Sequence, residues 1–290
     1  MKAISTNSLK NNTNQFLLLA IGTALIAIHL TLVWRSEDIN LFFNSILFWM
    51  AVSSFVGEKR SSLNLDSGIT SSILGVLIIV FSSLRISSLT PSINNIWLTS
   101  FPFFSALGLA LMASGVKGLK QYQKELMILF FLITPRLLIL LLPTIDLSIV
   151  TAKFSTIILW YTGFQIVQSG VTISFPEVGK GIEVYPGCSG TEQIIQILGI
   201  AILFISMFPL YKWQKILAPI LAATLAFMVN AARVALMAIF VARGNNNLFE
   251  YWHTGNGSQL FPVFTTLLFG CFCWFFFLRN EQENQDYTQV

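Results

Sequence analysis

Long apolar runs separated by short polar segments dominate this chain. A membrane-spanning helix needs roughly 17–25 predominantly apolar residues. By that measure the chain has eight candidate spans, and a non-spanning piece at 143–190 separates the fifth from the sixth. The eight predicted spans are 16–34, 41–56, 69–84, 96–113, 126–142, 191–209, 216–241 and 260–278.

The piece at 143–190 contains two shorter patterns. Residues 154–167 form an apolar run of fourteen residues, which is short for a ninth span, and we interpret it as an amphipathic helix at the membrane surface with Trp160 and Tyr161 at headgroup level. Beyond it, 171–175 and 182–185 carry β-type residues around a glycine-rich turn, which predicts a small β-hairpin.

Composition agrees with this pattern. The 290 residues are 54% hydrophobic and 10% charged, and the mean hydropathy is +0.72, which excludes a soluble domain. We predict an all-α polytopic membrane protein that forms a single integral membrane domain over 1–290. Its parts are anchoring spans at 1–142, the outer segment at 143–190, later spans at 191–278 and a disordered cytoplasmic tail at 279–290.

The distribution of Lys and Arg in the short loops predicts the orientation, because cytoplasmic loops carry an excess of both. With eight spans, ten of these residues lie on one side and five on the other. Both termini are then cytoplasmic and 143–190 is outside. A ninth span would put the lysine-containing loops at 117–124 and 212–215 on opposite sides. The polar residues at 1–15 lead into a first span without an A-x-A-like cleavage site, so we expect that span to be retained.

Cys188 lies where the outer segment meets the sixth span. Ser189-Gly190-Thr191-Glu192 has the S-x-x-E form of a capping box, in which Ser189 caps the helix and Glu192 returns to its backbone N–H. The partial positive charge of a helix N-terminus favours a thiolate, so Cys188 is a candidate nucleophile. The alternative is a small buried residue at a tight turn. The odd number of cysteines indicates no disulfide framework, and we expect Cys271 and Cys273 to serve in packing.

Two further polar groups accompany Cys188. Arg233 lies in the seventh span with Asn230 three residues before it on the same helix face, and a charged residue in a span is a functional candidate by default. The alternative is an Arg that snorkels or pairs with a buried acid. His253 lies in the following outer loop, whereas the other histidine, His29, is expected to pack between helices.

The predicted topology brings Cys188, Arg233 and His253 to the same outer face. A histidine can take or hold a thiol proton, a thiolate attacks a carbonyl, and an arginine can stabilise the oxyanion or orient the substrate. The three residues therefore form a chemically coherent set for cysteine acyl transfer, which makes 191–278 the catalytic spans.

In order and spacing these motifs resemble the exosortase/archaeosortase family of polytopic membrane enzymes. The resemblance rests on Cys188-Ser189-Gly190, on Asn230-Ala231-Ala232-Arg233 and on His253, and it covers nearly the whole chain. The chain length and the Pro-Gly before Cys188 look similar to the cyanobacterial branch.

The resemblance implies a transpeptidase-like protein-sorting enzyme of the cytoplasmic membrane. Its partners would be exported proteins with a C-terminal tripartite signal, in which a Pro-Glu-Pro-like motif precedes a spanning helix and a basic tail. Cleavage near the motif would give an acyl-enzyme on Cys188 and deliver the protein to the cell surface or its matrix. The family implies catalytic roles for Cys188, Arg233 and His253, with Ser189, Gly190 and Asn230 in support. No cofactor is expected.

Two other functions compete with this interpretation. A transporter or channel is a common role for an eight-span protein, but it would be expected to show interrupted helices or internal repeats, and no repeat is visible. A metalloprotease needs clustered ligands, and one outer histidine without an H-E-x-x-H motif is too few, so no metal is expected. The residues leave open whether His253 acts as base, acid or orienting group, and whether the acceptor is water, an amine or a lipid.

Overall fold

The computed structural model describes residues 6–87, 96–141 and 146–279. The chain forms two compact units, Met1–Ile133 and Thr134–Val290, whose boundary lies inside one helix. The tail predicted to be disordered lies outside the described residues from 280 onward.

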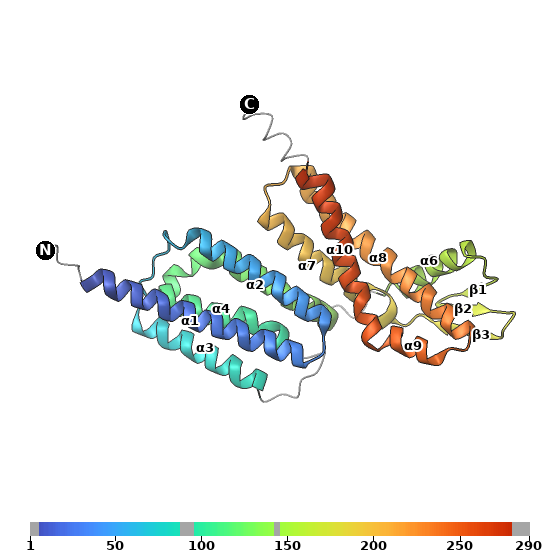
Figure 1. Ribbon diagram of the computed structural model, residues 1–290, viewed down its shortest axis with the longest axis horizontal. Coiled ribbons are helices and arrows are strands. Elements are labelled where there is room, and N and C mark those ends of the chain that lie inside the picture. The colour runs from blue at the N-terminus through green and yellow to red at the C-terminus, as the bar shows by residue number, and fades with distance from the viewer. Residues whose placement is uncertain (1–5, 88–95, 142–145, 280–290) are drawn as a thin grey trace, which may run out of the picture. The chain divides into compact units, whose positions relative to one another are not determined.

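The first unit is a group of antiparallel helices joined by short connections (Figure 1). Its elements are α1 (Thr6–Arg35), α2 (Ile39–Lys59), α3 (Ile69–Ser87), α4 (Ile96–Gly118), the short 3₁₀ helix η1 (Leu119–Tyr122) and the first part of α5 (Gln123–Leu141). Helices α3 and α4 approach closely at Gly75 and Gly108, where a Cβ on Gly75 would collide with the Gly108 carbonyl oxygen. Small residues allow the backbones of membrane helices to come this close.

Each predicted span corresponds to a helix, but the described part of the chain contains seven continuous apolar segments, not eight. One of them, Ile96–Pro135, is 40 residues long and includes both α4 and most of α5. At 1.5 Å per residue such a segment would be about 60 Å long, twice the hydrocarbon thickness. The backbone leaves the helical conformation at Gly115 (φ 65°, ψ −177°), which separates the two helices that the hydropathy pattern predicts.

His29 packs inside the first unit, as predicted. Its side chain is fully buried, Trp49 Nε1 donates to its Nδ1 at 3.1 Å, and its Nε2 lies 3.0 Å from the Leu98 carbonyl oxygen. Since Nδ1 accepts, Nε2 carries the proton and donates to Leu98. The ring also stacks on Phe101. Both ring nitrogens of His29 are therefore used to join α1, α2 and α4.

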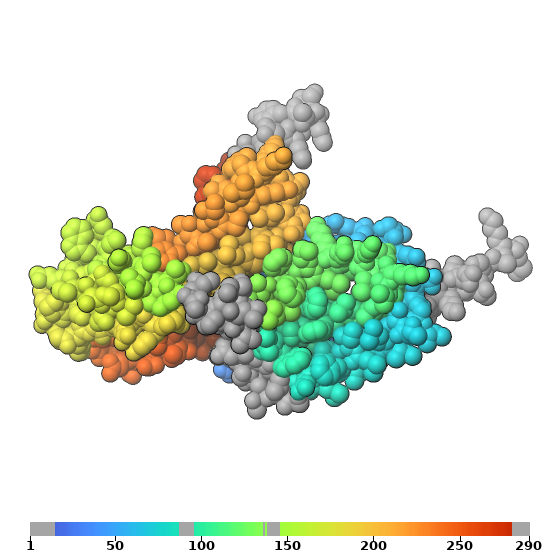
Figure 2. All heavy atoms as spheres, turned by 180° about the vertical axis from the view of Figure 1, so that it is seen from behind, coloured from blue at the N-terminus to red at the C-terminus, as the bar shows by residue number. Residues whose placement is uncertain are grey.

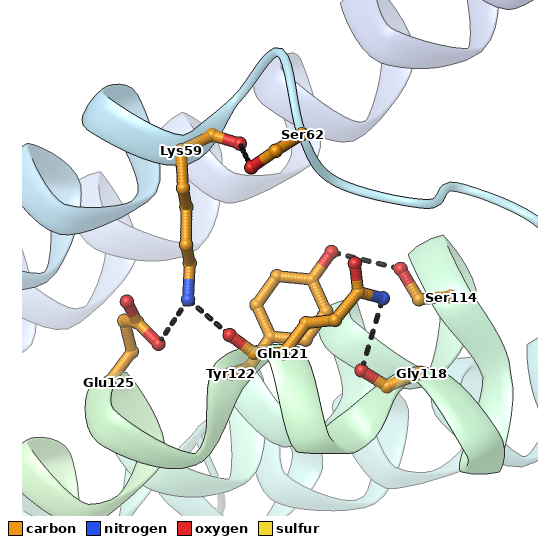
Figure 3. Close-up of polar contacts among 7 residues, drawn as sticks. All are labelled: Lys59, Ser62, Ser114, Gly118, Gln121, Tyr122 and Glu125. Carbon is orange, nitrogen blue, oxygen red and sulfur yellow. Dashed lines mark hydrogen bonds and ion pairs between the residues drawn. The ribbon is translucent and has the colours of Figure 1, made fainter.

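A polar cluster connects the end of α2 to the start of α5 in the same unit (Figure 3). Lys59 pairs with Glu125 at 2.8 Å and also donates to the Gln121 carbonyl. Beside them the Tyr122 hydroxyl lies 3.0 Å from that of Ser114. Glu125 is only 3% exposed, so the ion pair gives a buried carboxylate the partner that burial requires.

The second unit contains the remaining helices and a small sheet (Figure 1). Its helices are the end of α5, α6 (Ser148–Tyr161), α7 (Thr191–Met207), α8 (Lys212–Ala242), α9 (Asn246–His253) and α10 (Leu260–Cys273), with the short 3₁₀ helices η2 (Pro186–Cys188) and η3 (Asn256–Gln259) and the π-helical turn η4 (Trp274–Leu278). Of the two cysteines expected in packing, Cys273 is buried but Cys271 is exposed.

The predicted two-stranded hairpin is present, but it is part of a sheet of three strands. Strands β1 (Val167–Ser169), β2 (Thr172–Phe175) and β3 (Lys180–Glu183) form an antiparallel sheet in that order. The prediction missed β1 because the apolar run was extended to 167 as helix, whereas α6 ends at Tyr161 and Gly163 turns the chain with φ 91°. Glycine adopts that conformation without steric cost.

Helix α6 starts six residues earlier than predicted and has two distinct faces. Ser148, Thr151, Ala152, Ser155 and Leu159 are buried, whereas Trp160 and Tyr161 are 64% and 78% exposed. The buried polar positions recur at helical spacing, and one of them contacts α8, where the Ser155 hydroxyl donates to the Ala231 carbonyl at 2.9 Å. An exposed aromatic end agrees with the surface position predicted for this helix, although its depth in the membrane stays a prediction.

One apolar cluster joins the sheet to α6, α8 and α9. Ile173, Phe175 and Val184 pack against Val234, Met237 and Ala238 of α8, with Phe249 and Trp252 of α9 at the margin. In the space-filling view of Figure 2, the yellow strands lie between light green α6 and the orange-red segment of α9. These elements gather at the C-terminal end of α8, the half of the helix that carries Asn230 and Arg233.

Candidate active site

A tight turn fixes Cys188 at the junction of the sheet and α7. The Cys188 N–H donates to the Tyr185 carbonyl at 2.8 Å and the Ser189 N–H to that of Pro186 at 3.2 Å, which closes the 3₁₀ helix η2 with proline in its first turn. Tyr185, Pro186 and Gly187 are exposed and Cys188 is partly buried. The sulfur therefore lies at the edge of a rigid turn next to the start of α7.

The predicted capping box is wrong. Gly190, not Ser189, is the N-cap of α7, and its φ of 85° puts it in the left-handed region. Ser189 lies one residue outside the cap, is fully buried, and donates its hydroxyl to the Pro186 carbonyl at 2.7 Å. Its own carbonyl accepts a hydrogen bond from Thr151 of α6 at 2.7 Å. Ser189 therefore stabilises the turn that presents Cys188. The capping box does not form because the N-cap of α7 is one residue later than the S-x-x-E spacing requires.

Asn230 explains why a glycine follows Ser189. Its Nδ2 donates to the Cys188 carbonyl at 2.9 Å, and the side chain is 1% exposed. A Cβ on Gly190 would lie 2.7 Å from that same Nδ2. Gly190 is thus required both by its backbone conformation and by the approach of Asn230, which ties the cysteine turn to α8.

Arg233, almost one helical turn after Asn230, binds the end of α9. Its Nη2 donates to the His253 carbonyl at 2.8 Å and its Nε to the Trp252 carbonyl at 3.5 Å. A cation at a helix C-terminus is favourable because the last carbonyl groups lack partners in the helix. The guanidinium also lies 5.8 Å from the Phe261 ring centre. Among the described residues, Arg233 forms no ion pair with a buried acid, which was one of the two predicted alternatives.

His253 ends α9 and faces the cysteine. Its Nε2 lies 3.5 Å from the Cys188 sulfur, and its ring stacks on Phe249 with centres 4.9 Å apart. The helix that carries it is short, and the Asn245 side chain caps its start by accepting from the Leu248 N–H at 3.1 Å. The ring is therefore held by a capped helix, an aromatic neighbour and the arginine at its own carbonyl.

The pKa of His253 is lowered from its ordinary value of 6.5. Partial burial is the largest cause, the positive charge of Arg233 adds to it, and Glu250 acts in the opposite direction. The imidazole is therefore neutral at pH 7, and a neutral imidazole can accept a proton. Burial raises the pKa of the Cys188 thiol, and the positive charge of Arg233 acts in the opposite direction, favouring a negative sulfur.

All six residues singled out in the sequence lie in this cluster. Sequence reasoning missed Thr151 and Ser155 on α6, which hold the cysteine turn and α8, and Phe249 under the histidine. The polar residues 148, 151 and 155, three and four apart in an apolar helix, carried a signal for the first two. Within the described residues, no group of three His, Cys, Asp or Glu could hold a metal ion.

Fold and cluster together define a polytopic membrane protein with a cysteine–histidine pair at the end of its helices. A family model described as transmembrane exosortase matches residues 33–270. That match covers most of the 290 residues, so the chain belongs to the transmembrane exosortase family, whose members are sorting-related membrane enzymes. Neither a curated protein nor a solved structure matches the chain.

Proposed function

We propose that the protein is a cysteine transpeptidase or endopeptidase that cleaves a C-terminal sorting signal from exported proteins through an acyl-enzyme on Cys188. The single observation that carries the proposal is the 3.5 Å distance between Cys188 Sγ and His253 Nε2. These residues are 65 positions apart, and a cysteine in reach of a neutral histidine is the arrangement that activates a thiol nucleophile.

The first half of the reaction transfers the acyl group to sulfur. His253 Nε2 accepts the thiol proton as Cys188 attacks the scissile carbonyl carbon and the S–C bond forms. When the tetrahedral intermediate collapses, the C–N bond breaks and His253 returns the proton to the departing amine. The products are a thioester on Cys188 and the released signal segment.

The second half releases the acyl group to an acceptor. Water or an amine attacks the thioester, His253 takes the acceptor's proton, and the S–C bond breaks. The sulfur leaves as thiolate and recovers its proton from His253. Hydrolysis gives a carboxylic acid and an amine acceptor gives a new amide, so the chemistry at Cys188 and His253 is the same for an endopeptidase and a transpeptidase.

Arg233 has two roles in this proposal. Its bonds to the carbonyls of Trp252 and His253 position the histidine, and its charge favours the thiolate. A guanidinium has five N–H donors, and the bonds to Trp252 and His253 use two of them, so the remainder can serve the oxyanion of the tetrahedral intermediate. Asn230 supports the turn through the Cys188 carbonyl and does not need to touch the substrate.

In this proposal the site lies on the outer face of the cytoplasmic membrane and both termini lie in the cytoplasm, an orientation that the loop charges favour. Exported proteins would reach it after translocation, with a short Pro-Glu-Pro-like motif outside and the following helix still in the bilayer. The cut at the motif would free the protein for the cell surface or the extracellular matrix.

Co-expression with a tagged exported protein that ends in a Pro-Glu-Pro-type signal tests the proposal. We expect the wild-type enzyme to shorten the reporter, Cys188→Ala to leave it intact, and Cys271→Ala, a substitution at an exposed cysteine away from the site, to behave as wild type. Membrane levels of the three proteins are compared on immunoblots. Processing by Cys188→Ala at the wild-type rate would disprove the mechanism.

A further inference from the structure

Strand β3 is an edge strand, since β2 lies on one side of it and, among the residues that the structure describes, no strand lies on the other. The Val184 N–H donates to the Val171 carbonyl at 3.0 Å. Hydrogen-bonded and non-bonded pairs alternate in an antiparallel ladder, so the pair Ile173–Ile182 is bonded as well. The main-chain groups of Gly181 and Glu183 consequently point away from β2.

These outward groups are accessible. Gly181 and Glu183 are both exposed, and within the described residues neither main chain takes part in a hydrogen bond outside the sheet. Because Gly181 has no side chain, its exposure is exposure of the main chain itself. The Lys180 ammonium reaches the loop at Gly244, yet it leaves Gly181 open. An edge of this kind is a template for another extended chain.

The edge is also rigid and continuous with the nucleophile. Ile173, Phe175 and Val184 are at most 3% exposed and anchor the sheet on α8. Beyond Glu183 the chain passes the exposed Tyr185, Pro186 and Gly187 and reaches Cys188 five residues later. A peptide paired with β3 would therefore need only a few more residues, at about 3.3 Å each, to bring a peptide bond to the sulfur.

The other edge of the sheet offers a contrast. In β1, Gln168 faces Ile173 as a non-bonded pair, so its main-chain groups also point outward. The chain that precedes β1 leads back to α6, not to the cysteine turn. The two edges have similar chemistry, but only β3 is joined directly to the site.

We infer that the substrate binds as an extended segment added to the outer edge of β3, with main-chain hydrogen bonds to Gly181 and Glu183 that guide its scissile bond to Cys188. The inference rests on the proposed function and names how its substrate is held. Strand addition obtains affinity from the main chain and selectivity from alternate side chains. The partner is thus an extended, strand-forming peptide segment of the exported protein.

The variant Glu183→Pro tests this edge. The substitution removes the outward N–H of residue 183 and puts the proline ring in its place. The hydrogen bonds between β2 and β3 remain, since proline is tolerated on an edge strand where its N–H would face solvent. Loss of one or two main-chain hydrogen bonds predicts about a tenfold lower rate of reporter processing. Gln168→Pro makes the same change on the β1 edge and should process the reporter at the wild-type rate.

Labelling of Cys188 by a thiol-reactive probe, mapped by mass spectrometry, shows whether each variant keeps the site. Equal labelling and equal processing in Glu183→Pro and wild type would overturn the inference. If wild type itself left the reporter uncut, the proposed function would fail instead, so the two failures are distinguishable.

A second measurement does not depend on whether the two proline variants fold correctly. A photoreactive p-benzoylphenylalanine replaces Glu183 or Gln168 in protein that also carries Cys188→Ala, which retains uncut reporter. We expect illumination to cross-link the reporter at position 183 at least several times more than at 168. Equal cross-linking at both positions, or none at 183, contradicts strand addition at β3.

Discussion

The two units each contain one histidine, and the two imidazole rings differ in burial and in hydrogen-bond partners. His29 in the first unit is fully buried, and both of its nitrogens are bonded, to Trp49 and Leu98. His253 in the second unit is partly exposed, and its Nε2 faces the sulfur of Cys188 at 3.5 Å. Both rings stack on a phenylalanine. The nitrogens of His29 are thus used to join helices, whereas the Nε2 of His253 faces a thiol, and this is why the proposed mechanism assigns proton transfer to His253.

The cations differ in the same way. Lys59 of the first unit is paired with the buried carboxylate of Glu125, so its positive charge is balanced inside the folded unit. Arg233 of the second unit binds main-chain carbonyl groups, which carry only partial charge. Its positive charge therefore still acts on Cys188 and His253, which the proposed chemistry at an anionic sulfur and oxygen would require.

The largest effect is expected from His253→Gln. Removal of a general acid–base group lowers a rate by about 10²–10⁴-fold, and the partly exposed position predicts little change in stability. The measurement is the processing rate of the reporter together with thermal unfolding of the purified protein in detergent. A His253→Gln variant that processes at the wild-type rate would exclude the histidine from proton transfer.

The matched variant in the first unit is His29→Leu. It leaves the Trp49 N–H and the Leu98 carbonyl without partners, and each unsatisfied buried group costs about 1–3 kcal/mol. We expect a lower unfolding temperature and normal processing by the protein that remains folded. If His29→Leu abolished processing without a change in stability, the contrast between the two histidines would be wrong.

Arg233→Lys should have the next largest effect. A lysine keeps the charge but cannot reach two carbonyls with a fixed planar fork, so the histidine loses its positioning. We expect a fall of about ten- to a hundredfold in processing, because a displacement of about 1 Å costs around 10² in rate. Arg233→Met, which removes the charge as well, should be slower still. Equal rates for the two variants would show that only the planar fork matters.

Gly190→Ala and Gly75→Ala compare two glycines at which a neighbouring group leaves no room for a side chain. At Gly190 the added methyl meets Asn230 and strains a backbone with φ 85°, so we expect a loss of about 1–3 kcal/mol in stability and weaker processing as Cys188 moves. Gly75→Ala strikes the Gly108 carbonyl in the first unit and should reduce stability alone. The ratio of activity to folded protein separates the two outcomes.

The smallest expected effect concerns pH. The pKa of His253 is lowered from 6.5 in the folded protein, so the neutral base persists below that value and the acidic limb of the rate profile lies below pH 6.5. The folded state binds this proton less readily than the unfolded chain, so the contribution to stability is present above pH 6.5 and is lost as pH falls through the lowered pKa. In Glu250→Gln the pKa should fall further, because Glu250 raises it, and an acidic limb at higher pH would contradict this account.

The helices were the part of the fold most open to prediction. Apolar runs long enough to span a bilayer must satisfy their main chain internally, and a helix does so from local sequence alone. Residues Cys188, Asn230, Arg233 and His253 could be selected for similar local reasons, since polar groups are conspicuous in or beside spans. Strand β1 could not be found this way, because its partner β2 and the turn at Gly163 decide its conformation, not its own three residues.

Hydropathy and short motifs are local properties, so they were enough to identify a membrane-spanning chain of the exosortase type and the polar residues that are candidates for its chemistry. The partner of each of these residues depends on long-range contacts and became visible in the folded protein. Tertiary packing moved the helix cap from Ser189 to Gly190, where Asn230 leaves no room for a side chain, and it directed Arg233 to the end of α9. Such contacts join segments tens of residues apart, and packing across α6, α8 and α9 is what brings the sulfur and the imidazole together.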